Sequence, residues 1–144
     1  MNREAELIRL IRFFETIGQE HLHERLAQVY AADAQFKDPS NEVQGLAPIG
    51  GIFEHMFEQV NEPRFVVTTN VLQGSQAFLT WEFLFRMKRF SQEMQCIQGA
   101  THVIFDADGK VALHRDYWDA AEELYEKLPV LGSLMRWLKG RARR

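Results

Sequence analysis

The stretch Phe65-Val66-Val67-Thr68-Thr69-Asn70-Val71-Leu72 marks the point where the hydrophobic period of the chain changes to two. It is rich in β-branched residues, which favour strands. Three further strand-like stretches follow, at residues 77–86, 92–105 and 111–118, and short turns separate them. Because strands joined by short turns pair as hairpins, the second half of the chain is predicted to form an antiparallel sheet.

The residues before this stretch follow a helical period instead. Apolar side chains at positions 7, 10, 11 and 14 predict an amphipathic helix over residues 3–17, and a second short helix is expected between Leu22 and Tyr30. A short strand is expected at residues 34–38, and a third helix from Pro48 to Val60. Three helices covering one face of a strongly curved antiparallel sheet would give an α+β cone with a pocket at its mouth.

Composition narrows the class of protein. The 144 residues suit one domain, and 46% apolar with 26% charged residues is ordinary for a soluble protein. The 11 phenylalanines indicate either a Phe-rich core or a cavity with aromatic walls. Cys96 stands alone and cannot form an internal disulfide, and the first residues lack an apolar signal region. These features predict a cytoplasmic protein.

The charge is distributed unevenly along the chain. The formal net charge of −3 combines +5 on residues 136–144 with −8 on the rest. An acidic body argues against nucleic-acid binding. We therefore divide the chain into a domain at residues 1–128 and a basic amphipathic helical tail at residues 129–144. Residues 131–144 would dock on the body, on a second subunit, or weakly on a membrane surface.

The segment His114-Arg115-Asp116-Tyr117-Trp118 carries the densest group of reactive side chains. Alternation along a strand places His114, Asp116 and Trp118 on one face. A carboxylate beside an imidazole and an indole is costly to bury without a purpose. His114 and Asp116 are therefore candidate catalytic residues, and the alternative is a contact that locks the sheet edge. Asp119 is better placed to cap the helix that follows.

The layout, with Tyr30-Ala31-Ala32-Asp33-Ala34-Gln35-Phe36-Lys37-Asp38-Pro39 followed by Gly45-Leu46-Ala47-Pro48-Ile49, resembles the SnoaL-like branch of the nuclear transport factor 2-like superfamily. This group includes ketosteroid isomerases, polyketide cyclases and limonene epoxide hydrolases. The resemblance extends from about Glu6 to Trp118. It implies a cone-shaped α+β fold with an apolar pocket and no cofactor. It also implies a homodimer formed through the outer face of the sheet.

The resemblance also suggests roles for individual residues. Asp38, before Pro39, matches the proton-shuttling aspartate of the isomerases. Phe14 and Thr101 stand where those enzymes carry their two oxyanion donors, so steroid isomerase activity is not expected. The cyclases place an acid–base aspartate near the end of the sheet, which implies that His114, Asp116 and Trp118 face the cavity.

The remaining lining candidates are Phe53 on the third helix and Glu82 on the second long strand. Residues 79, 81, 83 and 85 form an apolar face that suits the core or a dimer interface. Glu82 lies on the other face, which would turn to the cavity or to solvent. Its position in the resembling fold favours the cavity. The sequence has no group of residues with metal-ligand spacing.

The leading hypothesis is a pocket for a small apolar molecule, with cofactor-free acid–base catalysis of an isomerase or cyclase type. Asp38 or Asp116 would be the base, and His114 a proton donor or oxyanion partner. Two alternatives remain open. One is a non-catalytic ligand-binding or protein-interaction module, and the other is a peripheral membrane protein that handles lipids through its C-terminal helix. The identity of the ligand and the type of reaction also stay open.

Overall fold

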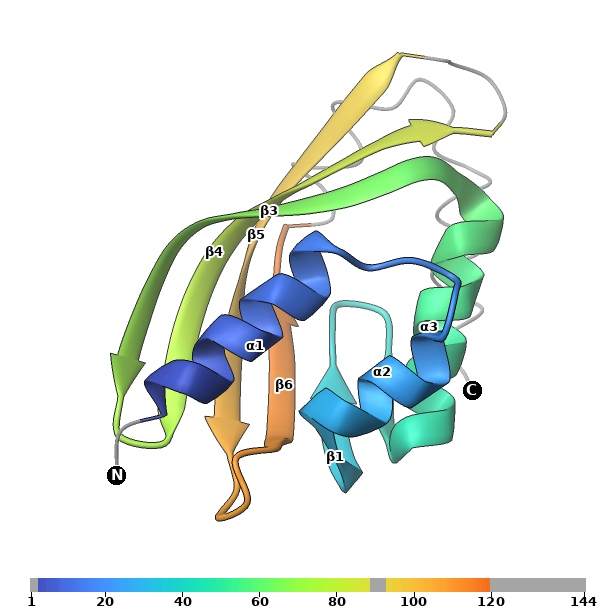
Figure 1. Cartoon of the computed structure of the whole chain (residues 1–144). Coiled ribbons are helices and arrows are strands. Elements are labelled where there is room, and N and C mark those ends of the chain that lie inside the picture. Colours follow the sequence, from blue (N-terminus) through green and yellow to red (C-terminus); the bar gives the residue numbers. More distant parts are fainter. Residues whose placement is uncertain (1–2, 89–92, 120–144) are drawn as a thin grey trace.

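The computed structural model describes residues 3–88 and 93–119 (Figure 1). The predicted tail at 129–144 and the helix that Asp119 was expected to cap lie outside these residues. The elements are, in chain order, α1 Glu4–Glu15, α2 Leu22–Val29, β1 Tyr30–Lys37, β2 Glu42–Gln44, α3 Leu46–Gln59, β3 Val60–Gln73, β4 Gln76–Met87, β5 Met94–Phe105 and β6 Val111–Tyr117. Within this part of the chain, every helix is too short or too polar to cross a bilayer.

The three predicted helices are present, and each buries the apolar face that predicted it. Helix α1 buries Leu7, Leu10 and Phe14 at helical spacing, and α2 buries Leu22 and Leu26. All three lie on one side of the sheet, and α1 runs across the concave face of the long strands (Figure 1). The apolar core fills the space between these layers.

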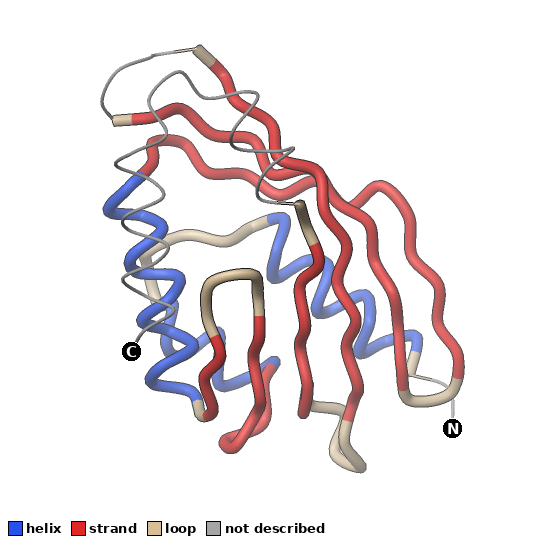
Figure 2. Tube along the Cα trace, turned by 180° about the vertical axis from the view of Figure 1, so that it is seen from behind, coloured by secondary structure: helices blue, strands red, loops and turns tan. Residues whose placement is uncertain are grey.

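The sheet has six strands in the order β2-β1-β6-β5-β4-β3 (Figure 2). Strands β3 to β6 are antiparallel, as predicted. Strand β1 pairs with β6 in parallel, so the sheet is mixed rather than wholly antiparallel. This pairing joins the first strand of the chain to the last strand that the structure describes. The short strand β2 was not predicted, and it pairs with β1 across the turn after Lys37.

Strand β3 begins at Val60, before the predicted stretch at Phe65, and so includes Pro63. Proline lacks the N–H that a sheet needs, so it is tolerated mainly at edges and bulges. Both conditions hold here, because β3 is an edge strand and its register with β4 shifts between Asn61 and Arg64. Glu62 takes a positive φ of 53° within this irregularity.

Gly99 serves packing rather than a bulge. The register between β4 and β5 runs through Gly99, opposite Trp81, without a shift. A Cβ at position 99 would lie 2.4 Å from the Cη2 atom of Trp81, well inside contact distance. The absence of a side chain at Gly99 therefore gives the Trp81 indole its place on the inner face.

The β5–β6 hairpin fixes which residues meet at the site. Gly109, with φ of 81°, donates its N–H to the carbonyl of Asp106 at 3.0 Å and closes the predicted turn. The register that follows sets Thr101 opposite Asp116, and Val103 opposite His114. Thr101, His114 and Asp116 consequently share the inner face of the sheet.

Candidate functional site

Two adjoining cavities lie on the inner face of the sheet. The large cavity has a volume of about 140 Å³ and the small one about 30 Å³. Phe53, Phe65, Trp81 and Asp116 line both of them. The walls are mainly aromatic, as the phenylalanine content had suggested. The other aromatic residues of the large cavity are Phe36, Phe83, Phe85 and Trp118.

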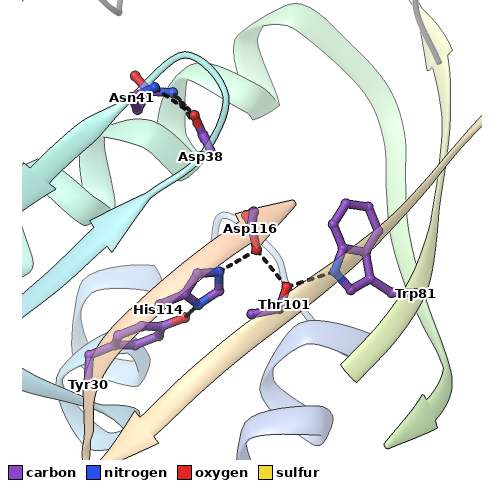
Figure 3. Close-up of polar contacts among 7 residues, drawn as sticks. All are labelled: Tyr30, Asp38, Asn41, Trp81, Thr101, His114 and Asp116. Atoms are coloured by element: carbon purple, nitrogen blue, oxygen red, sulfur yellow. Dashed lines mark hydrogen bonds and ion pairs between the residues drawn. The ribbon is translucent and has the colours of Figure 1, made fainter. Parts of the chain in front are cut away.

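Asp116 accepts two short hydrogen bonds on a single oxygen. Its Oδ1 lies 2.6 Å from Nε2 of His114 and 2.6 Å from the hydroxyl of Thr101 (Figure 3). The side chain of His114 is 2% exposed and that of Asp116 is 18% exposed. The carboxylate therefore reaches the cavity while the imidazole stays behind it.

The contacts of His114 fix its tautomer. An ionised carboxylate can only accept, so Nε2 of His114 carries the proton that it shares with Asp116. Nδ1 then accepts from the hydroxyl of Tyr30, at 2.7 Å. Burial, and after it the charge of Asp116, raise the pKa of Tyr30, which keeps this phenol protonated as a donor. Both ring nitrogens of His114 are thus engaged, and the ring orients Asp116.

A second chain of hydrogen bonds reaches Asp116 from the other side. The indole N–H of Trp81 donates to the hydroxyl of Thr101 at 2.8 Å, and that hydroxyl donates onward to Asp116. Two donor chains, from Tyr30 and from Trp81, therefore converge on one carboxylate oxygen (Figure 3). Such charge-assisted bonds are stronger than neutral ones, so they hold the carboxylate in one orientation.

The second oxygen of Asp116 is differently placed. Oδ2 has no hydrogen-bond partner within residues 3–88 and 93–119, and it points away from His114 and Thr101 (Figure 3). Since Asp116 lines both cavities, this oxygen is the group available to a bound molecule.

Asp38 has two positions of interest at once. It accepts hydrogen bonds from the turn that follows β1, and it lines the large cavity. Its Oδ1 accepts from the backbone N–H groups of Ser40 at 2.8 Å and Asn41 at 2.7 Å, and the Asn41 amide donates to both oxygens. Burial raises the pKa of Asp38, and the charge of Asp116 adds to this rise. The hydrogen bonds from Ser40 and Asn41 oppose the shift without cancelling it.

The structure brings seven of the eight predicted site residues to the two cavities. Phe14, Thr101 and His114 line the small cavity, Asp38 and Trp118 line the large one, and Phe53 and Asp116 line both. The eighth, Glu82, requires a correction.

Glu82 does not line either cavity. It lies opposite Gln98 on the outer face of the sheet, whereas its neighbours Trp81 and Phe83 point into the large cavity. The apolar face of β4 is therefore the cavity face. The prediction was wrong because a pocket with aromatic walls takes apolar residues where we had assigned polar ones.

Several residues of the site were missed as such from the sequence. Tyr30 contacts His114 from 84 positions away, and no local pattern pairs them. The Phe36 ring stacks on His114 with centroids 4.5 Å apart. Trp81 was assigned only to an apolar face, although Gly99 opposite a tryptophan is a usable signal of a close approach. Among the described residues, no three His, Cys, Asp or Glu side chains are grouped so that they could hold a metal ion.

Comparison with known protein families matches residues 10–114 to the model of the SnoaL-like domain. A comparison with curated proteins finds no match.

Solved structures share the fold at low sequence identity. A protein of unknown function from Burkholderia pseudomallei, described as NTF2-like, has a TM-score of 0.72 at 12% identity, over 87% of this chain and 96% of its own. A putative polyketide cyclase from Pseudomonas putida has a TM-score of 0.71 at 13% identity, over 89% and 98%. A hypothetical protein from Catenulispora acidiphila with a ketosteroid isomerase-like fold, solved in complex with trimethylamine, has a TM-score of 0.71 at 14% identity, over 85% and 91%.

Proposed function

Given that the chain belongs to the SnoaL-like domain family, we propose that its pocket performs cofactor-free acid–base chemistry on a small, largely apolar molecule. The observation that carries the proposal is the pairing of two carboxylates, Asp38 and Asp116, in one cavity with aromatic walls. Carboxylates in an apolar cavity cost free energy to desolvate, and such groups are typical of sites that act on a ligand. The complex of the Catenulispora protein with trimethylamine also supports a small-molecule ligand.

Asp38 is the proton-shuttling group in this proposal. Its raised pKa makes the carboxylate a stronger base than an exposed one. It removes a proton from an acidic C–H bond of the substrate. The O–H formed on Asp38 then returns that proton to the same or another carbon in an isomerisation, or to the alkoxide oxygen that forms when the carbanion attacks a carbonyl in a ring closure. No atoms are gained or lost, which fits an isomerisation or a ring closure.

Asp116 assists Asp38 through its charge. Its carboxylate raises the pKa of Asp38 beyond what burial achieves, so it makes the shuttle more basic. The donors on Oδ1 leave Oδ2 as the oxygen that meets the substrate. His114 and Tyr30 act in this scheme as positioning residues, because their polar atoms contact each other and Asp116.

Steroid isomerase activity is not part of the proposal. Phe14 has no hydroxyl, and the Thr101 hydroxyl already donates to Asp116. The two positions that carry oxyanion donors in the resembling isomerases therefore offer none here. The large cavity is also lined by two neutral polar side chains, those of Ser40 and Gln59. Among the described residues, neither of these side chains is hydrogen-bonded to Asp38.

The second candidate function is ligand binding without catalysis. It is favoured by the contacts of Asp38, whose Oδ1 accepts three hydrogen bonds from the turn at Ser40 and Asn41. Such a carboxylate can serve the turn alone. Under this reading the pocket acts as a receptor site, and substitution of Asp38 changes stability without removing any activity.

Hydrogen–deuterium exchange into small molecules separates the two candidates without knowledge of the natural substrate. Proton NMR in D₂O would follow C–H exchange across a panel of small ketones, keto esters and amino ketones. We expect exchange with the wild-type protein, and a loss of about 10²–10⁴-fold in Asp38→Asn, as for removal of a general base. Glu82→Gln removes the same charge from the outer face and should exchange like wild type. Equal exchange by all three proteins would exclude Asp38 as the shuttle.

A further inference from the structure

The charge of the large cavity has one sign. Two of its lining residues, Asp38 and Asp116, are carboxylic acids, and none of the described residues that line it is Lys, Arg or His. Within the described residues, the hydrogen bonds to the Asp116 side chain come from Thr101 and from His114, which lies behind it. Within the large cavity, the two carboxylates therefore face no cation from the described residues, and Lys37 and Arg115 lie beside them along a separate hollow.

The walls of the same cavity are aromatic. Phe65 and Phe83 stack with ring centroids 4.6 Å apart, and Trp81 meets Phe65 edge-on at 5.6 Å. The hydrogen bond from Trp81 to Thr101 holds the indole in place before any ligand arrives. Aromatic faces attract cations, and they do so most strongly where water is excluded.

These two features call for the same kind of ligand. A neutral apolar molecule would satisfy the rings but leave Oδ2 of Asp116 without a donor, whereas an inorganic cation would satisfy this oxygen but not the rings. An ammonium ion with alkyl substituents presents positive charge through an apolar surface, so it matches both. The volume of about 140 Å³ suits a compact ion of this type.

We infer that the large cavity binds an alkylated ammonium ion, held between Oδ2 of Asp116, the carboxylate of Asp38 and the indole rings of Trp81 and Trp118. This inference rests on the proposed function, since it names the substrate class of the same pocket. It also explains how acid–base chemistry proceeds there without the usual oxyanion donors. The positive charge of the substrate would stabilise negative charge that develops beside it.

Choline and its uncharged carbon isostere, 3,3-dimethylbutan-1-ol, provide the test because they share a shape and differ in charge. Isothermal titration calorimetry of the full chain would give both affinities. We expect choline to bind about 10-fold more tightly or better, the preference expected for a desolvated cation on aromatic faces. Equal affinities, tighter binding of the isostere, or no binding of either would overturn the inference.

Substitutions test whether the preference for choline over its isostere arises in this cavity. Asp116→Asn and Asp38→Asn should each reduce the ratio of the two affinities, whereas Glu82→Gln, on the outer face, should leave it unchanged. Trp118→Leu keeps apolar bulk but removes an aromatic ring from the cavity wall, so it should weaken choline more than the isostere. This variant decides the matter if either aspartate variant fails to fold. A preference that survives all three cavity substitutions would overturn the assignment to this site.

The outcomes also separate this inference from the proposed function. If neutral carbonyl compounds exchange deuterium in an Asp38-dependent way while choline does not bind, the cation inference fails and the proposed function stands. If choline binds and Asp38→Asn leaves deuterium exchange unchanged, the pocket is a cation receptor and the proposed chemistry fails.

Discussion

Asp38 and Asp116 line one cavity, and the negative charge of Asp116 raises the pKa of Asp38. The two residues arrive there by different routes. Asp38 lies in the turn that follows β1, whereas Asp116 lies in β6, the strand that pairs with β1 in parallel. The parallel pairing of β1 with β6 therefore brings the two carboxylates together. Because the pKa of Asp38 depends on the charge of Asp116, a substitution of one residue can be measured at the other.

The pH dependence of stability should report the environment of Asp38. Its pKa in the folded protein lies above the ordinary value of 3.8, so the folded state binds this proton more tightly than the unfolded state does. The contribution of this group is therefore fully present below pH 3.8 and is lost as the pH rises through the folded pKa. Urea unfolding of wild type and Asp38→Asn across the acid range should show this loss in wild type alone. A parallel pH dependence in the two proteins would contradict the assignment.

Tyr30→Phe should destabilise the protein by about 1–3 kcal/mol, because it leaves the buried Nδ1 of His114 without a donor. The tautomer should not change, because Asp116 still accepts from Nε2 of His114. Nitrogen-15 NMR of the histidine side chain should show a protonated Nε2 both in wild type and in the variant. A protonated Nδ1 in the variant would contradict the assignment of the proton to Nε2.

Gly99→Ala should displace the Trp81 indole, since the new methyl group would overlap its ring. Overpacking of this kind costs about 1–3 kcal/mol. The matched control is Gly51→Ala in α3, where a Cβ meets nothing within 4 Å and alanine should instead stabilise the helix. Chemical denaturation followed by tryptophan fluorescence measures both variants. A neutral Gly99→Ala would show that Trp81 has room to move.

The outer face of the sheet should carry the homodimer contact. Val71 and Phe78 are cross-strand neighbours there, 64% and 50% exposed, and Phe78 stacks on His102. Exposed apolar side chains that adjoin one another commonly mark an interface. Sedimentation analysis should therefore find a dimer for wild type and a monomer for Phe78→Glu. A wild-type monomer, or a dimer that Phe78→Glu leaves intact, would contradict this surface.

The sequence was most informative where structure depends on near neighbours. The period of the apolar residues predicted α1 and the four long strands, and the short turns between these strands predicted that they pair as hairpins. Alternation along β6 placed His114 and Asp116 on one face together with Trp118. Each of these features depends on residues within a few positions of each other.

Features that depend on distant pairing could not be predicted in the same way. The parallel contact of β1 with β6 and the bond from Tyr30 to His114 join residues with no shared local pattern. Alternation also does not say which face of a sheet the helices cover. Glu82 was assigned to the cavity for that reason, although Trp81 and its apolar neighbours hold that place.

The most direct test of the carboxylate pair is the pKa of Asp38, measured by carbon-13 NMR titration of the aspartate carboxyl groups in wild type and Asp116→Asn. The structure predicts a value above 3.8 in wild type and a lower value in Asp116→Asn, because the variant removes the charge that disfavours ionisation of Asp38. An Asp38 that titrates at or below 3.8 in wild type, or that does not respond to Asp116→Asn, would contradict the account.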